Sequence, residues 1–152
     1  ATIAALGTRF VNSSESKAHP LYQQAIAEAR EGDAVMTPCF DGDWPYSGVR
    51  ALRNRTVVDW EAQGCPPPGR RPGENEIVAT TAAGWNIPRY HIASPVDTTT
   101  GEVLDLALYA GTSCARIDDV QSAQDILETL CPLASYNESR LRPRASAMQA
   151  SS

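Results

Sequence analysis

Residues 2–10 of the chain are Thr2-Ile3-Ala4-Ala5-Leu6-Gly7-Thr8-Arg9-Phe10. The first five are small or apolar throughout, which is typical of a strand that is covered on both faces. Gly7 follows directly, and because it carries no Cβ, a ligand can approach its backbone closely. Successive N–H groups beyond such a strand, together with the hydroxyl of Thr8, suit a phosphate. Taken alone, the pattern also fits an ordinary turn between a strand and a loop.

The length of 152 residues and the hydrophobic fraction of 42% fit one globular domain. The formal net charge of −5 argues against a nucleic-acid-binding protein, because such proteins normally present a basic face. A phosphate site in this chain is therefore expected to depend on local backbone dipoles. No apolar run approaches the ~20 residues of a transmembrane helix, and no signal-peptide pattern is present. We expect a cytoplasmic protein without membrane contact, and a gene product that starts upstream of Ala1, since Ala1 lies inside the expected strand.

The four cysteines are Cys39, Cys65, Cys114 and Cys131. Their spacing contains no Cys-x-x-Cys pair and no cluster with histidine, so we expect no metal site. The even count permits two disulfides. Because nothing signals secretion, we expect reduced thiols that pack inside the protein.

Two helices are expected in the first half of the chain. The first runs from about Pro20 to Glu31, since Pro is favoured at the first helical position and Gly32 suits the end. His19, directly before it, is expected to cap the helix or to bond at the surface. The second runs from about Val49 to Gln63, where apolar residues recur every three or four positions, and it places Arg50 on its solvated face.

The other segments are less regular. Residues 34–40 are expected to form an edge strand that Pro38 interrupts, and residues 66–73 an extended, mobile loop. Residues 76–83 suit a short helix and residues 87–93 a short strand. Alternation of Leu104, Leu106 and Leu108 predicts a strand over residues 104–109. A last helix is expected over about Val120 to Leu130, capped by Asp118 or Asp119 and stopped by Pro132.

Further motifs follow the Leu6–Phe10 motif in a characteristic order. They are Glu15-Ser16, His19-Pro20-Leu21-Tyr22, Val49-Arg50-Ala51-Leu52-Arg53-Asn54 and Leu108-Tyr109-Ala110-Gly111-Thr112. In this order, over about residues 2–133, the chain resembles the C-terminal part of the nitronate monooxygenases, formerly called 2-nitropropane dioxygenases. The first and the last motif are the more specific ones, and residues 64–107 match poorly.

The resemblance implies an α/β fold: the C-terminal portion of a TIM-type (β/α)8 barrel with a small α+β excursion, incomplete as an isolated chain. Residues 1–18 would be a late barrel strand and phosphate loop, and residues 19–107 the excursion domain. Residues 108–134 would be the barrel-closing segment with the final helix. Residues 135–152 are polar and basic, and we expect them to be disordered.

The resemblance also implies a site for FMN. Similar enzymes hold the flavin phosphate with the backbone of the pair that corresponds to Gly7 and Thr8, near the ends of late barrel strands. Arg9 would add charge there, or else face solvent or pair with a carboxylate.

A second implied segment lines the substrate side of the flavin ring and comprises Tyr109, Gly111 and Thr112. The alternative for Tyr109 is a buried tyrosine whose hydroxyl is satisfied within the protein. The catalytic His of similar enzymes corresponds to a position upstream of Ala1, so we expect no catalytic residue in this chain. His91 is expected to be structural.

The reaction that the resemblance implies is FMN-dependent oxidation of alkyl nitronates by O₂ to a carbonyl compound and nitrite. The implied partners are a small nitronate, O₂ and the N-terminal part of the barrel. Without that part, we expect the isolated chain not to be a competent FMN enzyme. Two alternatives stay open: an FMN-dependent enoyl-thioester reductase that uses NAD(P)H, and a non-catalytic α/β interaction module.

Overall fold

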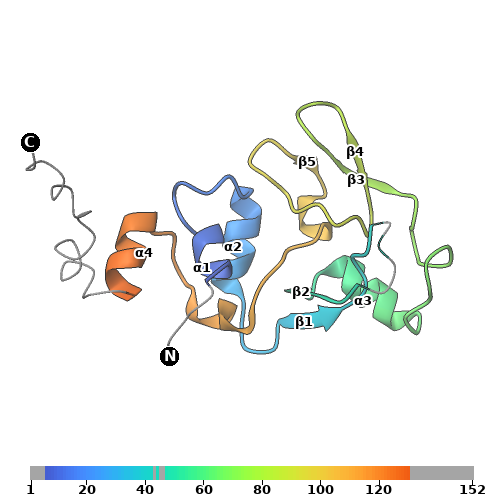
Figure 1. Cartoon of the computed structure of the whole chain (residues 1–152). Helices are drawn as coiled ribbons and strands as arrows, with labels where there is room; N and C mark the ends of the chain where they lie inside the picture. The colour runs from blue at the N-terminus through green and yellow to red at the C-terminus, as the bar shows by residue number, and fades with distance from the viewer. Residues whose placement is uncertain (1–5, 43, 45–46, 131–152) are drawn as a thin grey trace, which may run out of the picture.

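The computed structural model of the chain describes residues 6–42, 44 and 47–130. In Figure 1, α4 lies at one side next to α1 and α2, and the strands lie on the other. In chain order, the elements are α1 (Thr8–Val11), α2 (Pro20–Glu28), β1 (Ala34–Thr37), β2 (Val49–Leu52), α3 (Arg55–Ala62), β3 (Ile77–Thr80), β4 (Asn86–Pro88), β5 (Thr100–Gly101), the 3₁₀ helices η1 (Val103–Asp105) and η2 (Thr112–Arg116), and α4 (Ala123–Leu130).

The start of α2 follows the prediction closely. Pro20 is its first residue, and Nδ1 of His19 accepts a hydrogen bond from Leu21 N at 3.1 Å, which caps the helix. Tyr22 and Ile26 are buried on its inner face. The helix ends at Glu28, before the predicted end at Glu31.

The prediction of one helix over residues 49–63 is wrong in its first part. Val49–Leu52 is strand β2, which pairs antiparallel with β1, and α3 begins only at Arg55. Asn54 separates the two elements, because its Oδ1 accepts from Val57 N at 3.2 Å and caps α3. Apolar spacing over so few residues suits either element, and the backbone bond from Leu52 N to Leu108 O at 2.8 Å favours the strand.

The predicted helix over residues 76–83 is also wrong. Ile77–Thr80 is β3, which pairs antiparallel with both β4 and β5. The strand predicted over residues 87–93 is present in shortened form as β4. Gly101 in β5 has φ +106° and lies so close to β3 that a Cβ there would be 2.5 Å from Val78 O. Only glycine fits this position.

The strand predicted over residues 104–109 is replaced in part by η1. Leu104 is exposed, whereas Leu106 and Leu108 are buried, so the predicted common face is wrong for Leu104. Helix α4 begins at Ala123 instead of Val120.

The cap of α4 also differs from the prediction. The Oγ of Ser122 accepts from Asp125 N at 3.0 Å, so Ser122 caps the helix instead of Asp118 or Asp119.

The loop at residues 66–73 contains turns and bends and is anchored by the buried side chain of Arg71. Arg71 donates to Asp41 Oδ1 at 2.8 Å and to Glu74 Oε1 at 2.8 Å, and its guanidinium lies over the ring of Tyr90 at 4.4 Å. Trp60 Nε1 donates to Pro66 O at 2.9 Å. These contacts bind the loop to the body of the protein instead of leaving it extended.

Buried apolar side chains form three clusters. The first joins α2, β1, β2, residues 108–110 and η2, the second joins β2 to α3, and the third lies between β3, β4 and η1. Residues of the expected excursion domain and of the expected closing segment therefore share one cluster, and the domain boundaries stay a prediction. The largest fully buried side chains in the clusters are Phe40, Ile26, Ile87, Leu106 and Leu108.

Strands β1 to β5 pair antiparallel, and the described residues contain no closed barrel. The expected late barrel strand falls on residues 1–5 and on Leu6, which is in no strand, and the expected tail falls on residues 135–152; all but Leu6 lie outside the described residues. No helix in the described part of the chain has the length and apolar character to cross a membrane.

The three cysteines that the structure describes are free thiols. Cys39 and Cys114 are buried as expected, and burial raises the pKa of Cys39 to about 12. Cys65 is exposed, so the expectation of a packed thiol is wrong there. Cys131 lies outside the described residues.

Candidate functional site

A cleft of about 610 Å³ brings together residues from both ends of the described chain. One side is formed by the start of α1 and by α2. The other is formed by β2, the segment around Pro95 and the segment from Tyr109 to Gly111. Four of the residues predicted as binding residues line this cleft: Gly7, Thr8, Tyr109 and Gly111.

One hydrogen bond fixes the two predicted binding segments against each other. Gly111 N donates to the Thr8 Oγ1 at 2.8 Å, although the two residues are 103 positions apart. A Cβ on Gly111 would lie 3.4 Å from the same oxygen, so the absence of a side chain permits this close approach. Thr8 therefore uses its hydroxyl oxygen to hold Gly111.

The backbone at Gly7 begins α1. Phe10 N and Val11 N donate to Gly7 O at 3.0 and 3.2 Å, and the N–H groups of Thr8 and Arg9 precede these first helical bonds. Gly7 has φ −81° and ψ −61°, so it needs no conformation special to glycine. A Cβ on Gly7 would have nothing within 4 Å among the described residues, which leaves this side of the backbone open.

Tyr109 both lines the cleft and has its hydroxyl satisfied. Its OH donates to Ile92 O at 2.8 Å, and its carbonyl accepts from the hydroxyl of Tyr22 at 2.5 Å. Burial raises the pKa of Tyr109, and burial followed by the charge of Tyr109 raises that of Tyr22. Both phenols therefore stay protonated near neutral pH. Each phenol already donates its single proton to a backbone carbonyl, so the two rings can pack against a ligand, and neither hydroxyl is suited to act as a base.

Arg9 and Thr112 are not brought to the cleft lining. Arg9 donates to Asp119 Oδ1 at 2.8 Å and to Asp119 O at 3.3 Å, so its charge is held by a carboxylate. The pKa of Asp119 is lowered, first by a hydrogen bond from Gln121 and then by Arg9. Thr112 is exposed at the start of η2, one residue beyond Gly111.

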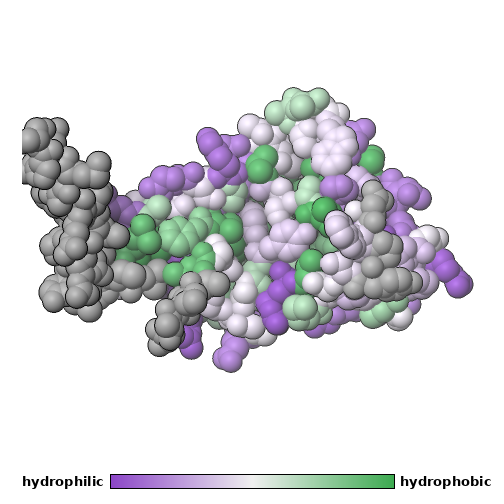
Figure 2. Space-filling model, viewed as in Figure 1, coloured by the Kyte–Doolittle hydropathy of each residue, from purple (hydrophilic) through white to green (hydrophobic). Residues whose placement is uncertain are grey.

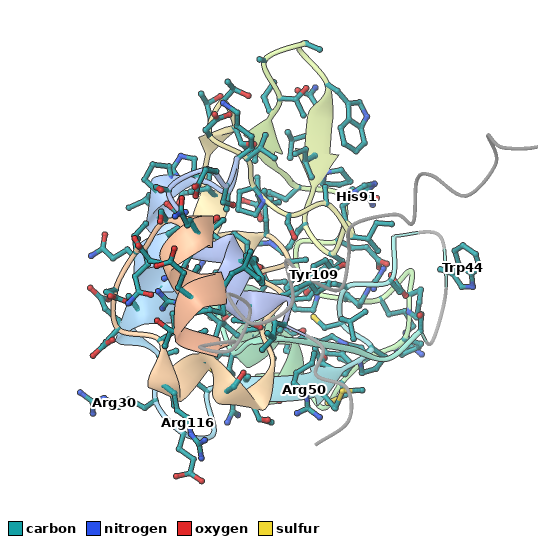
Figure 3. The ribbon with its side chains drawn as sticks, turned by 60° about the vertical axis from the view of Figure 1, so that its left-hand side comes forward. Arg30, Trp44, Arg50, His91, Tyr109 and Arg116 are labelled. Carbon is teal, nitrogen blue, oxygen red and sulfur yellow. The ribbon has the colours of Figure 1, made fainter. Side chains whose placement is uncertain are left out.

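Two cationic residues of the cleft, Lys17 and Arg50, were not predicted from the sequence as site residues. Figure 3 labels Arg50 below Tyr109, whereas Arg30 and Arg116 extend at the lower left edge of the molecule. Arg50 was missed because it was assigned to a solvated helix face, whereas it lies on β2. Asn54 is the signal that would have found it, since a favoured N-cap residue there starts the helix after residue 54.

Both histidines of the chain lie outside the cleft lining. His19 caps α2, as described above. Nδ1 of His91 accepts from Ala93 N at 3.0 Å, and its ring packs edge-on against Trp85 at 4.8 Å. Within the part of the chain that the structure describes, no group of three or more His, Cys, Asp or Glu is placed to hold a metal ion.

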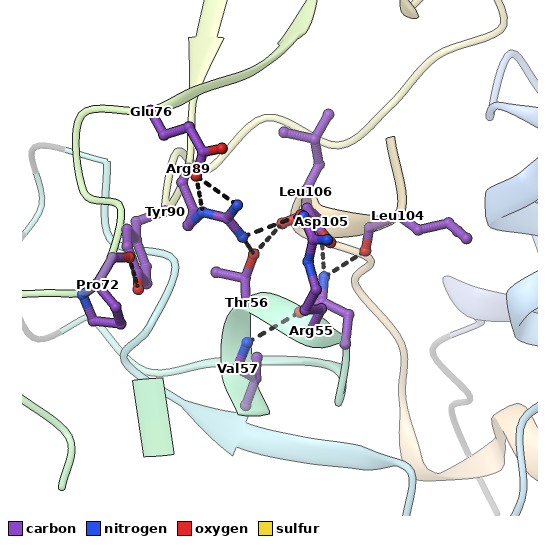
Figure 4. Close-up of polar contacts among 11 residues, drawn as sticks. Arg55, Thr56, Val57, Pro72, Glu76, Arg89, Tyr90, Leu104, Asp105 and Leu106 are labelled. Atoms are coloured by element: carbon purple, nitrogen blue, oxygen red, sulfur yellow. Dashed lines mark hydrogen bonds and ion pairs between the residues drawn. The ribbon is translucent and has the colours of Figure 1, made fainter. Parts of the chain in front are cut away.

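A second polar cluster is buried between α3, β4 and η1, and Figure 4 shows it. Arg89 Nη1 donates to Asp105 Oδ2 and to Thr56 Oγ1, each at 3.1 Å, and its other nitrogens donate to Glu76. Arg55 pairs with the same carboxylate of Asp105. Because the buried charges of Arg89 and Asp105 compensate each other, we interpret this cluster as structural.

A family model described as nitronate monooxygenase matches residues 1–132 of the chain. Among solved structures, the chain is similar to a FabK mutant from Thermotoga maritima, with 23% sequence identity and a TM-score of 0.47. That match covers 91% of this chain and 36% of the FabK chain, so the chain spans little more than a third of that protein's length. No curated protein matches the chain.

Proposed function

The chain belongs to the nitronate monooxygenase family, and from this premise we propose that it is part of an FMN-dependent enzyme that oxidises alkyl nitronates with O₂. The products would be a carbonyl compound and nitrite. The observation that carries the proposal is the cleft where Gly7, Thr8, Tyr109 and Gly111 meet.

The cleft suits a group of the size of FMN. Its volume is about 610 Å³, and small-molecule sites usually occupy roughly 300–1,000 Å³. Its lining is mainly apolar and contains the half-buried ring of Tyr109, which suits an aromatic ring system. The open side of Gly7 allows a ligand close to the backbone.

We assign the residues of this chain as follows. The backbone N–H groups at Gly7 and Thr8 would hold the flavin phosphate, and the bond from Gly111 to Thr8 Oγ1 keeps them in place. Tyr109 and Gly111 would line the pocket for flavin and substrate. Thr112 would lie at its edge, and Arg9 would act only indirectly, through Asp119. Bound FMN would supply the electron transfer from nitronate to O₂.

The other partner that we propose is the N-terminal part of the family's barrel. Leu6, Val120 and Leu127 are 40%, 50% and 54% exposed. Figure 2 shows hydrophobic surface over the region of α1 and α4, where these residues lie. An apolar surface of this kind is typical of a face that packs against further protein.

The phosphate assignment is tested by Gly7→Asp in the encoded polypeptide that contains this chain. The new carboxylate would repel a phosphate, whereas the fold has room for a side chain at this position. Asp is also favourable at a helix N-cap. We expect FMN affinity, measured by quenching of flavin fluorescence, to fall by about tenfold or more. Gly7→Asn is the matched control, since it has the same size without the charge, and equal affinities of the two variants would contradict the assignment.

The reaction is tested by nitronate-dependent oxygen uptake. We expect uptake with an alkyl nitronate and formation of nitrite. The matched assay follows reduction of a crotonyl thioester by NAD(P)H. Thioester reduction without nitronate oxidation would refute the proposed reaction and favour the enoyl-reductase alternative.

A further inference from the structure

The cleft has a charge character opposite to that of the chain as a whole. The chain has a formal net charge of −5, yet the charged residues of the cleft lining are Lys17 and Arg50. Among the described residues, no Asp or Glu lines it. A cleft with cations and without carboxylates favours an anionic ligand.

Arg50 also differs from the other arginines that the structure describes. Five of them pair with carboxylates: Arg9, Arg53, Arg55, Arg71 and Arg89. Arg50 has no carboxylate within ion-pair distance among the described residues, as is also true of Arg30, Arg70 and Arg116. Those three are exposed to water, whereas Arg50 is partly buried. A guanidinium that loses water without gaining a carboxylate is in an unfavourable position that an anion would relieve.

The backbone of Arg50 is held next to the predicted binding segments. Residue 50 pairs with Met36 in the β1–β2 ladder, and Arg50 O accepts from Ala110 N at 3.2 Å. Ala110 directly precedes Gly111, whose N–H bonds to Thr8 Oγ1 at 2.8 Å. Hydrogen bonds from the successive residues Ala110 and Gly111 therefore connect β2, which carries Arg50, with Thr8 at the start of α1.

Lys17 reaches the same cleft from the other side, but its position is weaker. Its ammonium lies 3.4 Å from Asp97 Oδ2, and its side chain is 83% exposed. Water and Asp97 both reduce its attraction for a ligand. Arg50 is thus the main cation of the cleft, and Lys17 lies at its rim.

We propose that Arg50, assisted by Lys17, binds the phosphate of the flavin mononucleotide. This inference rests on the proposed function, since it assumes that FMN is the ligand of the cleft. A guanidinium can donate two parallel hydrogen bonds to a phosphate, and a phosphomonoester carries up to two negative charges for the two cations. A nitronate substrate carries one negative charge. Arg50 would thereby supply the charge that the sequence analysis assigned to Arg9.

The experiment compares FMN with riboflavin, which lacks the phosphate, in the encoded polypeptide that contains this chain. We expect Arg50→Gln to weaken FMN binding by about 10-fold to 100-fold, the usual range for a lost charge-assisted hydrogen bond. Riboflavin affinity should change by less than about twofold, because it makes no phosphate contact. Arg50→Lys should give an intermediate loss. Arg116→Gln, which removes the same charge from an exposed position, should change neither affinity.

A second measurement uses the same encoded polypeptide, unsubstituted and free of flavin, with inorganic phosphate. Nitrogen-15 NMR should show the Arg50 Nε and Gly111 amide signals shifting with phosphate, and not with chloride at the same ionic strength. This measurement needs neither flavin nor a variant. Absence of any shift at Arg50 would overturn the inference.

The results separate this inference from the proposed function. If FMN binds and Arg50→Gln weakens FMN and riboflavin equally, or weakens neither, the inference is wrong and the proposed function survives. If Arg50→Gln changes only the KM for the nitronate, Arg50 is a substrate residue and the inference is again wrong. If neither flavin binds but phosphate shifts the Arg50 signal, the anion site is supported and the proposed function fails.

Discussion

Arg89 connects three parts of the molecule through a single guanidinium. The side chain is buried, and it donates to Glu76 directly before β3, to Thr56 on α3 and to Asp105 on η1. Asp105 is buried as well, so its carboxylate depends on its partners. Removing one member of a buried ion pair leaves the other charge without compensation, which costs far more than the loss of a surface pair.

We therefore expect Arg89→Met to lower the free energy of unfolding by about 3 kcal/mol. Arg55 still pairs with Asp105 in this variant, which keeps the loss near the low end of the usual range. Arg53→Met is the matched control, because it breaks a pair with Glu61 whose side chains are 52% and 32% exposed. Its cost should stay below about 1 kcal/mol. Urea unfolding followed by circular dichroism measures both, and losses equal within about 0.5 kcal/mol would contradict the role of Arg89.

Arg9 and Arg50 show how far single residues of the site could be predicted from the sequence. Arg9 follows Gly7 and Thr8 directly, so sequence proximity favoured it as the cation of the site. The structure pairs it with Asp119, 110 positions away, and such a partner leaves no local signal. Arg50 is 42 positions beyond Thr8, and its place at the cleft depends on the pairing of β2. Gly7, Thr8, Tyr109 and Gly111 could be named because they belong to specific motifs.

At the level of elements, local signals predicted well where a single residue defines a boundary. His19-Pro20 predicted the start of α2, because a cap and a proline act within one turn. Val49–Leu52 and Ile77–Thr80 were assigned to helices, and both are strands. The bonds that make them strands come from residues 34–37, 86–88 and 100–101, and a short apolar segment carries no record of such partners.

Asn54 joins α3 to η1 and is more than a helix cap. Its Oδ1 accepts from Val57 N at 3.2 Å, while its Nδ2 donates to Leu104 O and Leu106 O, each at 2.8 Å. We expect Asn54→Ala to lower the free energy of unfolding by about 2–3 kcal/mol, since it removes a cap and leaves two carbonyls without a donor. Ser122→Ala, which removes the cap of α4 alone, should cost only about 1 kcal/mol.

Asn54→Asp separates the two roles of Asn54. The carboxylate keeps an acceptor for Val57 N but has no hydrogen to donate, and it places a negative charge against the two carbonyl oxygens. The cost should therefore be at least as large as that of Asn54→Ala. Thermal unfolding of the three variants gives the order, and a stable Asn54→Asp protein would show that the bonds to η1 contribute little.

The whole molecule combines two small antiparallel sheets with helices that pack on shared apolar clusters. Its family membership could be inferred from motifs, because the specific Gly7-Thr8 and Tyr109–Thr112 segments both lie within the matched residues 1–132. The arrangement between these motifs could not be predicted, because the strands there form by pairing with segments that a short apolar run does not identify. Residues of the candidate site could thus be predicted from their motifs, whereas the strands that bring these residues together could not.

The apolar surface over α1 and α4 should make the isolated chain associate with itself. Val120 and Leu127 are 50% and 54% exposed there, and water contact with such side chains is unfavourable. We expect the isolated 152-residue chain to self-associate through this face in sedimentation experiments at concentrations on the order of 100 μM. Val120→Glu combined with Leu127→Glu should weaken the association by about tenfold or more, since burial of one Leu contributes roughly 1.5–3 kcal/mol.

A matched double variant distinguishes this face from general stickiness. Val58→Glu combined with Ile77→Glu also replaces two exposed apolar residues, on α3 and β3 at the opposite side of the molecule (Figure 1). This pair should leave the association unchanged. If both double variants weaken it equally, or if the wild-type chain stays monomeric at all concentrations, the face near α1 and α4 is not the one that packs against further protein. If only the Val120/Leu127 pair weakens the association, this face is supported as the place where the rest of the barrel binds. An exposed apolar face that drives self-association is typical of a surface that other protein covers in the complete molecule.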